Sequence, residues 1–267
     1  MLGVKFHNIA QEGMMFSLAG KVALITGSTK GIGKSIAEEM ANAGAKVVIS
    51  SRKAEACTAV RAEFAARGQE AIAVPCNVGD KAAAQNLVDT TLEKWGRIDV
   101  LVCNAASNPH FGPVATASDE AFDKIMATNV KSVFWLGNMA LPQMAALGGG
   151  AMIIISSIGA LRGSTVTGLY GTSKAAEAGL ARALAVEWGP KNIRVNTIAP
   201  GLIRTDFAKA LWSDDARRKS REATTPMRRI GEPRDIGGVA VFLASEAASF
   251  VTGQMIVADG GVTIAGS

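Results

Sequence analysis

A tyrosine and a lysine four residues apart give this chain of 267 residues its clearest chemical signal. Tyr170 and Lys174 would share one face of a helix, which places the lysine ammonium near the ring that carries the phenol. A phenol ionises with a pKa of about 10, and a neighbouring positive charge favours the phenolate and lowers that pKa. The pair therefore predicts a general acid/base, although many helices carry a tyrosine and a lysine at this spacing by chance.

A glycine-rich turn lies near the start of the chain, between an apolar run and a helical pattern over residues 34–43. It reads Thr26-Gly27-Ser28-Thr29-Lys30-Gly31-Ile32-Gly33. Glycines let the backbone turn tightly and approach a pyrophosphate, and the helix that follows presents free N–H groups to it. The spacing differs from the common dinucleotide fingerprint, so the placement between strand and helix carries the prediction of a phosphate cradle.

The second apolar run ends at Ile49-Ser50-Ser51-Arg52, where an acidic residue would bind the adenosine ribose of NAD. This stretch contains no acid. Arg52 instead offers a planar fork suited to a 2′-phosphate, and Lys30 could reach the same group. Either residue alone could be a solvated surface charge. Both together, with the acid missing, favour NADP(H) over NAD(H).

Two asparagines follow two further apolar runs, in Cys76-Asn77-Val78 and in Asn104-Ala105-Ala106. Ligands of open α/β sheets bind beyond the carboxyl ends of the strands. We therefore expect Asn77 to bond the adenine, and Asn104 with its small neighbours to let the cofactor lie close to the backbone. Each could equally be an ordinary turn asparagine.

Apolar, β-branched runs alternate with helical patterns along the chain, without a low-complexity linker or an internal repeat. Runs that are apolar on both faces need helices on both sides of the sheet. The pattern predicts one α/β domain with a Rossmann fold over residues 18–267, preceded by an extension of residues 1–17. Its sheet should be seven-stranded, parallel and doubly wound, with strands at residues 22–26, 47–50, 71–76, 100–103, 152–156, 194–198 and 255–257.

Composition excludes several other classes of protein. The chain is 48% hydrophobic, but its longest apolar runs are strand-sized, so no membrane span is expected. The net charge of +5 is spread along the chain, which favours solvated helix faces or an anionic cofactor over nucleic-acid binding. Cys57, Cys76 and Cys103 lack metal-ligand spacing and the two histidines are isolated, so neither disulfides nor a metal site is expected.

Taken in order, these residues resemble the short-chain dehydrogenase/reductase family over residues 18–261. After the glycine turn, the motifs that carry the resemblance are Asn104-Ala105-Ala106, Asn129, Ser157, Tyr170-x-x-x-Lys174, Asn196 and Pro200-Gly201-x-x-x-Thr205. Two positions depart from the family pattern. Asn77 stands where many members have Asp, and Cys103-Asn104-Ala105-Ala106 stands where many have Asn-Asn-Ala-Gly.

The resemblance implies hydride transfer between a nicotinamide and a carbonyl or alcohol substrate. Tyr170 would protonate the carbonyl oxygen or deprotonate the alcohol, and Ser157 would hold that oxygen by a hydrogen bond. Lys174 would lower the pKa of Tyr170 and bond the nicotinamide ribose, while Asn129 would hold a water in a proton relay. Ser157 is preferred to Ser156 because the family places this serine thirteen residues before the tyrosine.

By the same resemblance, Ile203 and Thr205 would contact the nicotinamide end of the cofactor, next to Pro200 and Gly201. The charged, helical segment 205–229 would form a mobile lid over the substrate, although its apolar residues could merely pack on the core. The expected pocket lining, at residues 108–111, 158–162 and 207–212, is apolar with few charges. Such a pocket suits a medium-sized hydrophobic carbonyl.

Several stretches particularly resemble the family's NADP-dependent carbonyl and retinal reductase branch. That branch is typically peroxisomal in animals and has a Ser-Arg-Leu or Ser-Lys-Leu type of ending, whereas this chain ends Ile264-Ala265-Gly266-Ser267. A cytoplasmic protein is therefore expected. Residues 254–261 resemble the last strand of the family, which commonly packs across a tetramer interface, so a homotetramer is expected; the segment could also be a core edge strand.

Three hypotheses follow for the function. The first is an NADP(H)-dependent oxidoreductase acting on a ketone, an aldehyde or a secondary alcohol. The enzyme alternatives are an NAD(H)-linked alcohol or sugar dehydrogenase and a 3-oxoacyl thioester reductase. The third hypothesis, from another class, is a non-catalytic dinucleotide sensor. Such a protein should have lost catalytic residues. Because all four catalytic residues of the family pattern are present, namely Asn129, Ser157, Tyr170 and Lys174, the sequence favours an enzyme.

Overall fold

Seven short strands, all parallel, form one sheet in the computed structural model of the chain, which describes residues 15–265. The strands are β1 (Val22–Thr26), β2 (Lys46–Ser50), β3 (Ala71–Ala73), β4 (Val100–Cys103), β5 (Gly150–Ile155), β6 (Ile193–Pro200) and β7 (Met255–Ala258). Their order across the sheet is β3-β2-β1-β4-β5-β6-β7. The predicted doubly wound parallel sheet is confirmed.

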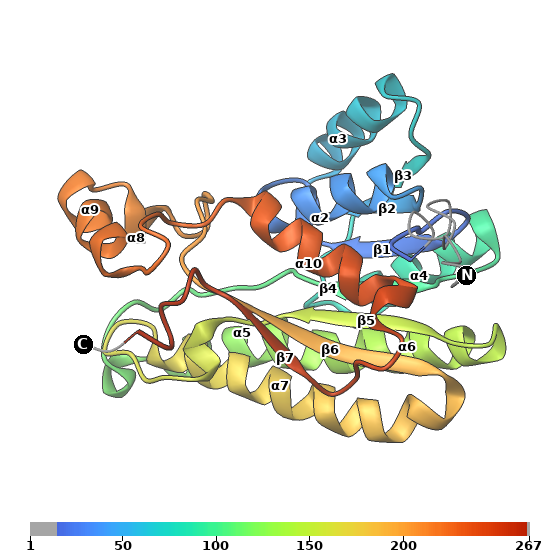
Figure 1. Cartoon of the computed structure of the whole chain (residues 1–267). Coiled ribbons are helices and arrows are strands. Elements are labelled where there is room, and N and C mark those ends of the chain that lie inside the picture. Colours follow the sequence, from blue (N-terminus) through green and yellow to red (C-terminus); the bar gives the residue numbers. More distant parts are fainter. Residues whose placement is uncertain (1–14, 266–267) are drawn as a thin grey trace, which may run out of the picture.

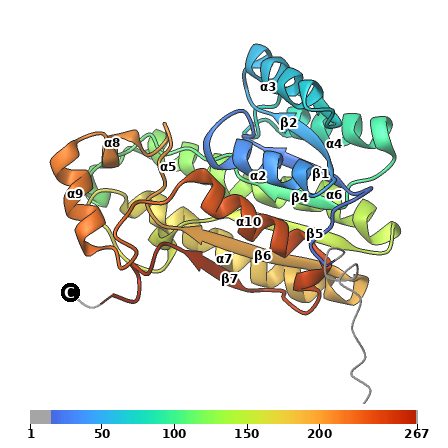
Figure 2. The ribbon, with the colours of Figure 1, turned by 45° about the horizontal axis from the view of Figure 1, so that its top comes forward.

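Helices cover both faces of this sheet, as Figures 1 and 2 show. One face carries α2 (Gly31–Asn42), α3 (Ala54–Ala66) and α10 (Pro233–Ala244), and the other carries α4 (Lys81–Trp95), α6 (Ser132–Ala146) and α7 (Gly168–Trp188). Helix α5 (Asp119–Met126) continues through a π-helical turn into α6, whereas α8 (Lys209–Trp212) and α9 (Asp215–Thr224) lie outside these layers. In both views α8 and α9 project beyond one end of the sheet.

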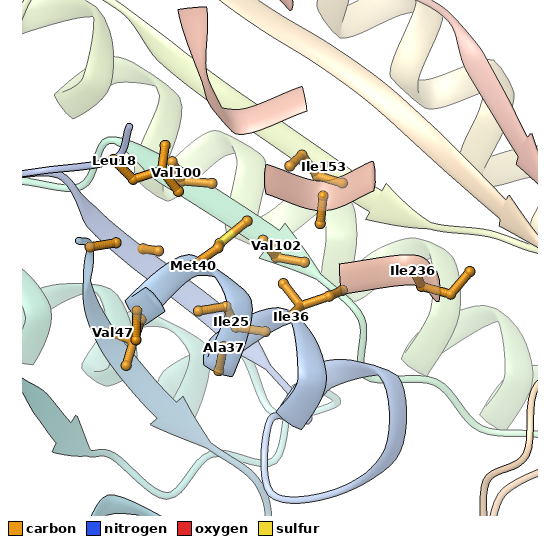
Figure 3. Packing of buried hydrophobic residues seen from close by; sticks show 14 of the residues in the cluster. Leu18, Ile25, Ile36, Ala37, Met40, Val47, Val100, Val102, Ile153 and Ile236 are labelled. Carbon is orange, nitrogen blue, oxygen red and sulfur yellow. The ribbon is translucent and has the colours of Figure 1, made fainter. Parts of the chain in front are cut away.

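Two apolar clusters hold these layers together. In the first, shown in Figure 3, Ile36 and Met40 of α2 and Ile236 of α10 pack on Ile25 and Val102 of the sheet. The second cluster lies under α4, α6 and α7 on the opposite face. Each fully buried Ile, Leu or Met contributes about 1.5–3 kcal/mol. The two helices on which the candidate site depends, α2 and α7, are therefore anchored to the sheet along their lengths.

Strand ends differ from the sequence prediction most clearly at β3. The predicted strand runs to Cys76, but the observed one ends at Ala73. Pro75 explains the difference, because proline has no N–H to donate to a strand ladder. The N–H groups of Val74 and Cys76 still bond to Ile49 and Ser51, so the chain continues alongside β2. The other strands lie within two residues of their predicted ends.

Residues 205–229 also depart from the prediction of one helical stretch; because the resemblance predicts a lid there, we call them the lid segment, or lid. It breaks into α8 and α9, because Asp214 caps a new helix by accepting a hydrogen bond from the Arg217 N–H. Of the predicted N-terminal extension, residues 1–14 lie outside the described residues. No helix between residues 15 and 265 is long and apolar enough to cross a bilayer.

Candidate active site

A large cleft of about 2560 Å³ opens beyond the carboxyl ends of the strands. Segments that directly follow β1, β2, β4, β5 and β6 all line it. Every residue predicted to bind the cofactor contributes to its wall, namely Gly27, Thr29, Lys30, Gly31, Ile32, Gly33, Arg52, Asn77, Val78, Asn104, Ala105, Ala106, Tyr170, Lys174, Pro200, Gly201, Ile203 and Thr205. Ser157 lines it too, whereas Asn129 does not.

The glycine turn makes one end of the cleft and needs its glycines. Gly27 and Gly31 have φ angles of +67° and +56°, in the left-handed region that side chains disfavour. A Cβ on Gly33 would lie 2.3 Å from the carbonyl oxygen of Gly27, so no other residue fits there. Helix α2 begins within this turn, at Gly31, without a side-chain cap, so its first N–H groups are left for a ligand of the cleft.

Asn104 braces this turn from the neighbouring strand. Its side-chain amide donates to the carbonyls of Thr26 and Gly27 at 2.9 and 3.1 Å. In return, the Thr26 hydroxyl accepts from the N–H groups of Asn104 and Ala105. The asparagine predicted to lie beside the cofactor therefore also fixes the shape of the phosphate cradle.

The charged residues predicted to read a 2′-phosphate both lie at the cleft surface. Arg52 is exposed and has no hydrogen-bond or ionic partner among residues 15–265. Lys30 forms an ion pair with Asp206 of the lid at 3.2 Å. Asn77 is exposed in the same wall, and its side-chain oxygen accepts from the Gly79 N–H.

The two adjacent serines after β5 have different environments. The Ser156 hydroxyl is buried and donates to the backbone carbonyl of Lys174 at 2.9 Å, which ties β5 to α7. Ser157 is half-buried, and its hydroxyl accepts from the Gly159 N–H at 3.0 Å. Because the Ser156 proton is held by the backbone, Ser157 is the serine whose hydroxyl proton remains available toward the cleft.

Tyr170 and Lys174 lie one turn apart on α7, as their spacing predicts. The Lys174 Nζ is 5.4 Å from the centroid of the Tyr170 ring. Burial raises the pKa of Tyr170, and the ammonium of Lys174 acts in the opposite direction without cancelling it. The spacing of the pair predicts only the lowering of this pKa; the larger effect of burial becomes visible in the fold.

One buried charge beside this pair escaped the sequence prediction. Glu177, three residues after Lys174, accepts a hydrogen bond from the Lys174 Nζ at 2.7 Å. Both side chains are only 2% exposed. The signal available in the sequence is an isolated acid in the small-residue stretch Ala175-Ala176-Glu177-Ala178, on the same helix face as the lysine.

Asn129 lies behind the cleft wall and is fully buried. It sits in a π-helical turn, Ala127–Lys131, between α5 and α6. Its side chain accepts from the Ser107 N–H at 2.8 Å and donates to the Ser107 carbonyl and the Ser173 hydroxyl. Asn129 thus joins the loop after β4 to α7, and π-helical turns of this kind frequently mark functional sites.

The lid brings both apolar and charged groups to the cleft. Phe207 lies with its ring centroid 6.1 Å from that of Tyr170. Trp212, predicted to line the pocket, instead donates to the Thr205 carbonyl and stacks with Arg204. Arg217 and Arg221 of α9 line the cleft, so the expectation of few charges is wrong on this side. The sequence pattern alone did not show which face of α9 turns inward.

The cysteines have no place in this chemistry. Cys57, Cys76 and Cys103 are all free and buried. Burial, with a contribution from Asp80, raises the pKa of Cys76 to about 11, and burial raises the pKa of Cys103 as well. Such thiols stay protonated at neutral pH and are poor nucleophiles. No group of three or more His, Cys, Asp or Glu suited to a metal ion occurs within residues 15–265.

A doubly wound parallel sheet, a glycine turn after its first strand and a tyrosine–lysine pair in the same cleft define the class of nicotinamide-dependent oxidoreductases. Similarity to known proteins agrees. A family model described as Enoyl-(Acyl carrier protein) reductase matches residues 27–263. Dehydrogenase/reductase SDR family member 4 of Sus scrofa is 43% identical over 244 residues, which cover 91% of this chain and 88% of that protein.

Two solved structures share the fold closely. A 7 alpha-hydroxysteroid dehydrogenase in complex with NADH and 7-oxo glycochenodeoxycholic acid is 38% identical, with a TM-score of 0.89 over 92% of this chain and 96% of that one. A gluconate 5-dehydrogenase from Burkholderia cenocepacia with NADP and tartrate is 32% identical, with a TM-score of 0.91 over 96% and 100%. The chain belongs to the short-chain dehydrogenase/reductase family and is an oxidoreductase, as its motifs predict.

Proposed function

We propose that this chain is an NADP(H)-dependent oxidoreductase that interconverts a ketone or aldehyde and the corresponding alcohol, with Tyr170 as the general acid/base. One observation carries the proposal: Tyr170, Lys174 and Ser157 line the same cleft as the glycine turn. A nicotinamide cofactor and a carbonyl substrate bound there would both be within reach of the tyrosine.

The residues present fit a dinucleotide phosphate. Gly33 lets α2 pack directly against the Gly27 carbonyl and so sets the shape of the turn, the start of α2 has no side-chain cap, and Arg52 is an exposed cation whose side chain has no partner among the described residues. We assign the pyrophosphate to the glycine turn and the 2′-phosphate to Arg52 and Lys30. Asn77 and Val78 would hold the adenine, and Ile203 and Thr205 the nicotinamide end. When bound, NADP(H) supplies or accepts the hydride.

Side chains of α7 and of the segment that follows β5 perform the proton chemistry in this proposal. In reduction, the Tyr170 hydroxyl donates its proton to the carbonyl oxygen, and the Ser157 hydroxyl donates a hydrogen bond to that oxygen. Lys174 favours the resulting phenolate through its positive charge. In oxidation the same phenolate accepts the alcohol proton. Asn129 supports this arrangement by joining α7 to the loop after β4, and we assign to it the water of a proton relay to solvent.

The proposal is tested by initial rates with NADPH and NADH on a panel of carbonyls: an α-diketone, an aromatic ketone, retinal and an acetoacetyl thioester. Gluconate and a hydroxysteroid with NADP⁺ and NAD⁺ test the oxidising direction. We expect turnover with NADPH that Tyr170→Phe abolishes. Preference for NADH would overturn the cofactor assignment, and absence of turnover on every substrate would overturn the carbonyl reductase assignment in favour of a dinucleotide sensor.

A second function, reduction of a 3-oxoacyl thioester, is favoured by the lid. Arg221 lines the cleft, and its guanidinium has no hydrogen-bond or ionic partner among residues 15–265; the guanidinium of Arg217 bonds only to the backbone carbonyl of Ala210. Guanidinium groups of this kind suit the phosphates of a thioester carrier. This second function is tested by comparing the rates of reduction of acetoacetyl-coenzyme A and of the acetoacetyl thioester of N-acetylcysteamine, which carries no phosphate. A large preference for the coenzyme A form, lost in Arg221→Ala, would support it.

We also propose a homotetramer. Support comes from apolar side chains exposed on α6 and α7, including Phe134 and Val186, and from β7 at the edge of the sheet. Light scattering should give about four times the chain mass of 27.6 kDa; a monomeric mass would contradict the assignment. A cytoplasmic location stays a prediction, which cell fractionation would test.

A further inference from the structure

Glu177, the buried partner of Lys174, has no role in the mechanism above, yet it is paired with the lysine that lies beneath the acid/base. Glu177 belongs to α7 and its side chain is only 2% exposed. An acidic side chain is almost never buried so completely without a specific partner. Its partner is the lysine that the proposed chemistry needs in its charged form.

The contacts of Lys174 define what Glu177 does to it. The ammonium donates to the backbone carbonyl of Ile155 at 2.9 Å and to Glu177 Oε1 at 2.7 Å. Among the described residues no third acceptor is present, so two of its three N–H groups are fixed and one remains for the cleft. The second carboxylate oxygen of Glu177 has no hydrogen-bond partner there.

The charges around the pair explain why the lysine needs this partner. Burial alone lowers the pKa of Lys174, but the charges of Glu177 and Tyr170 outweigh it and the net pKa is raised. Burial raises the pKa of Glu177 to about 7, against the opposing effect of Lys174. The other titratable groups facing the pair are Tyr170 from α7 and the buried thiol of Cys103 from β4. Within residues 15–265, Glu177 is thus the only carboxylate that contributes to the charge state of Lys174.

We propose that Glu177 is a positioning residue that keeps Lys174 protonated and fixes its side chain beneath Tyr170. Without this carboxylate, Lys174 would be an unpaired cation in an apolar layer and would lose its proton as the pH rises. A neutral amine no longer favours the phenolate of Tyr170. This inference rests on the proposed function of Tyr170 and Lys174, and it adds a third residue to the same helix face.

The first test is the pH profile of kcat/KM in NADPH-dependent reduction. Glu177→Gln keeps the volume and a hydrogen-bond acceptor but removes the charge. We expect its alkaline limb to move to lower pH by on the order of one unit, while activity at low pH is largely kept. Glu177→Asp should restore the limb in part, and Glu187→Gln, an exposed acid on the same helix, should not move it. A Glu177→Gln profile that matches wild type, or a loss equal at every pH, would overturn the proposal.

The second test needs no activity. Thermal unfolding of the cofactor-free chain is compared for Glu177→Gln, Lys174→Met and the double variant. If the two groups form a charge pair, each single change lowers the melting temperature and the double change recovers most of the loss, because a lone buried charge costs more than none. Additive losses would overturn the pairing. If the Tyr170→Phe variant remains active, the proposed function fails, whatever the unfolding measurements show. If Tyr170→Phe is inactive and both Glu177 tests fail, only the present inference fails.

Discussion

Two ion pairs border the same cleft and differ in almost everything but their length. Lys174–Glu177 at 2.7 Å joins side chains that are 2% exposed, whereas Lys30–Asp206 at 3.2 Å joins side chains that are 69% and 71% exposed. The first lies in the floor, formed by the end of β5 and α7; the second links the glycine turn to the lid, residues 205–229. Water therefore screens the exposed pair far more strongly than the buried one.

This difference separates the part of the cleft where we place the chemistry from the part where substitutions should be tolerated. In the floor, the Ser156 hydroxyl ties the end of β5 to α7, and Ile155 and Glu177 fix the Lys174 side chain, so the groups proposed to react lie on a fixed framework. In the lid, exposed charges on α8 and α9 form contacts of low energy. We expect substitutions in the floor to change turnover and substitutions in the lid to change access and affinity.

The largest effect that sharpens this comparison is expected for Lys174→Met. Removing the cation leaves the Tyr170 phenolate unsupported and Glu177 buried without a partner, so kcat should fall on the order of 10³-fold. Lys219→Met, on the exposed lid helix, is the control and should retain kcat. A Lys174→Met enzyme with near-normal kcat would remove the lysine from the mechanism.

Next in size is Gly33→Ala, which tests the glycine turn. The new Cβ would meet the Gly27 carbonyl at 2.3 Å, so the turn must shift and NADPH affinity should fall on the order of 10²-fold. Gly238→Ala is the matched control, because its Cβ would meet nothing within 4 Å in α10. Equal NADPH dissociation constants for both variants, measured by fluorescence titration, would contradict the cradle.

A smaller effect is expected for Arg52→Ala. Loss of a charged hydrogen bond to the 2′-phosphate should weaken NADPH by about tenfold and leave NADH unchanged. Arg61→Ala, on the exposed side of α3, serves as the control. Michaelis constants for both coenzymes decide the matter: if they rise equally, Arg52 does not distinguish NADP(H) from NAD(H).

The smallest effect is expected where the lid pair is broken. Asp206→Asn removes an exposed ion pair, so the KM for substrate should change by less than about twofold and become insensitive to salt. Rates measured at low and high ionic strength provide the check. A change comparable with that of Lys174→Met would break the comparison, because an exposed pair would then matter as much as a buried one.

Much of this site was predictable because its signals are local. The glycine turn, the strand ends and the Tyr170–Lys174 spacing are each set by a few neighbouring residues, and the sheet follows from the alternation of apolar runs. The role of Glu177 was not predicted, because it follows from the burial of Lys174 against β4 and β5, which are distant from α7 in the sequence. The sequence also did not predict which face of α9 lines the cleft, because the Asp214 cap starts a separate helix whose orientation does not continue that of α8.

Tyr170 of the floor and Phe207 of the lid meet across the cleft with ring centroids 6.1 Å apart, and they allow the central claim to be measured directly. The measurement is kcat and substrate KM for Tyr170→Phe and Phe207→Leu, beside the NADPH dissociation constant of each. We predict that Tyr170→Phe loses kcat by at least about 10²-fold with NADPH affinity kept, while Phe207→Leu mainly raises KM. Retained kcat in Tyr170→Phe, or a kcat loss of similar size in Phe207→Leu, would contradict the assignment of the chemistry to the floor.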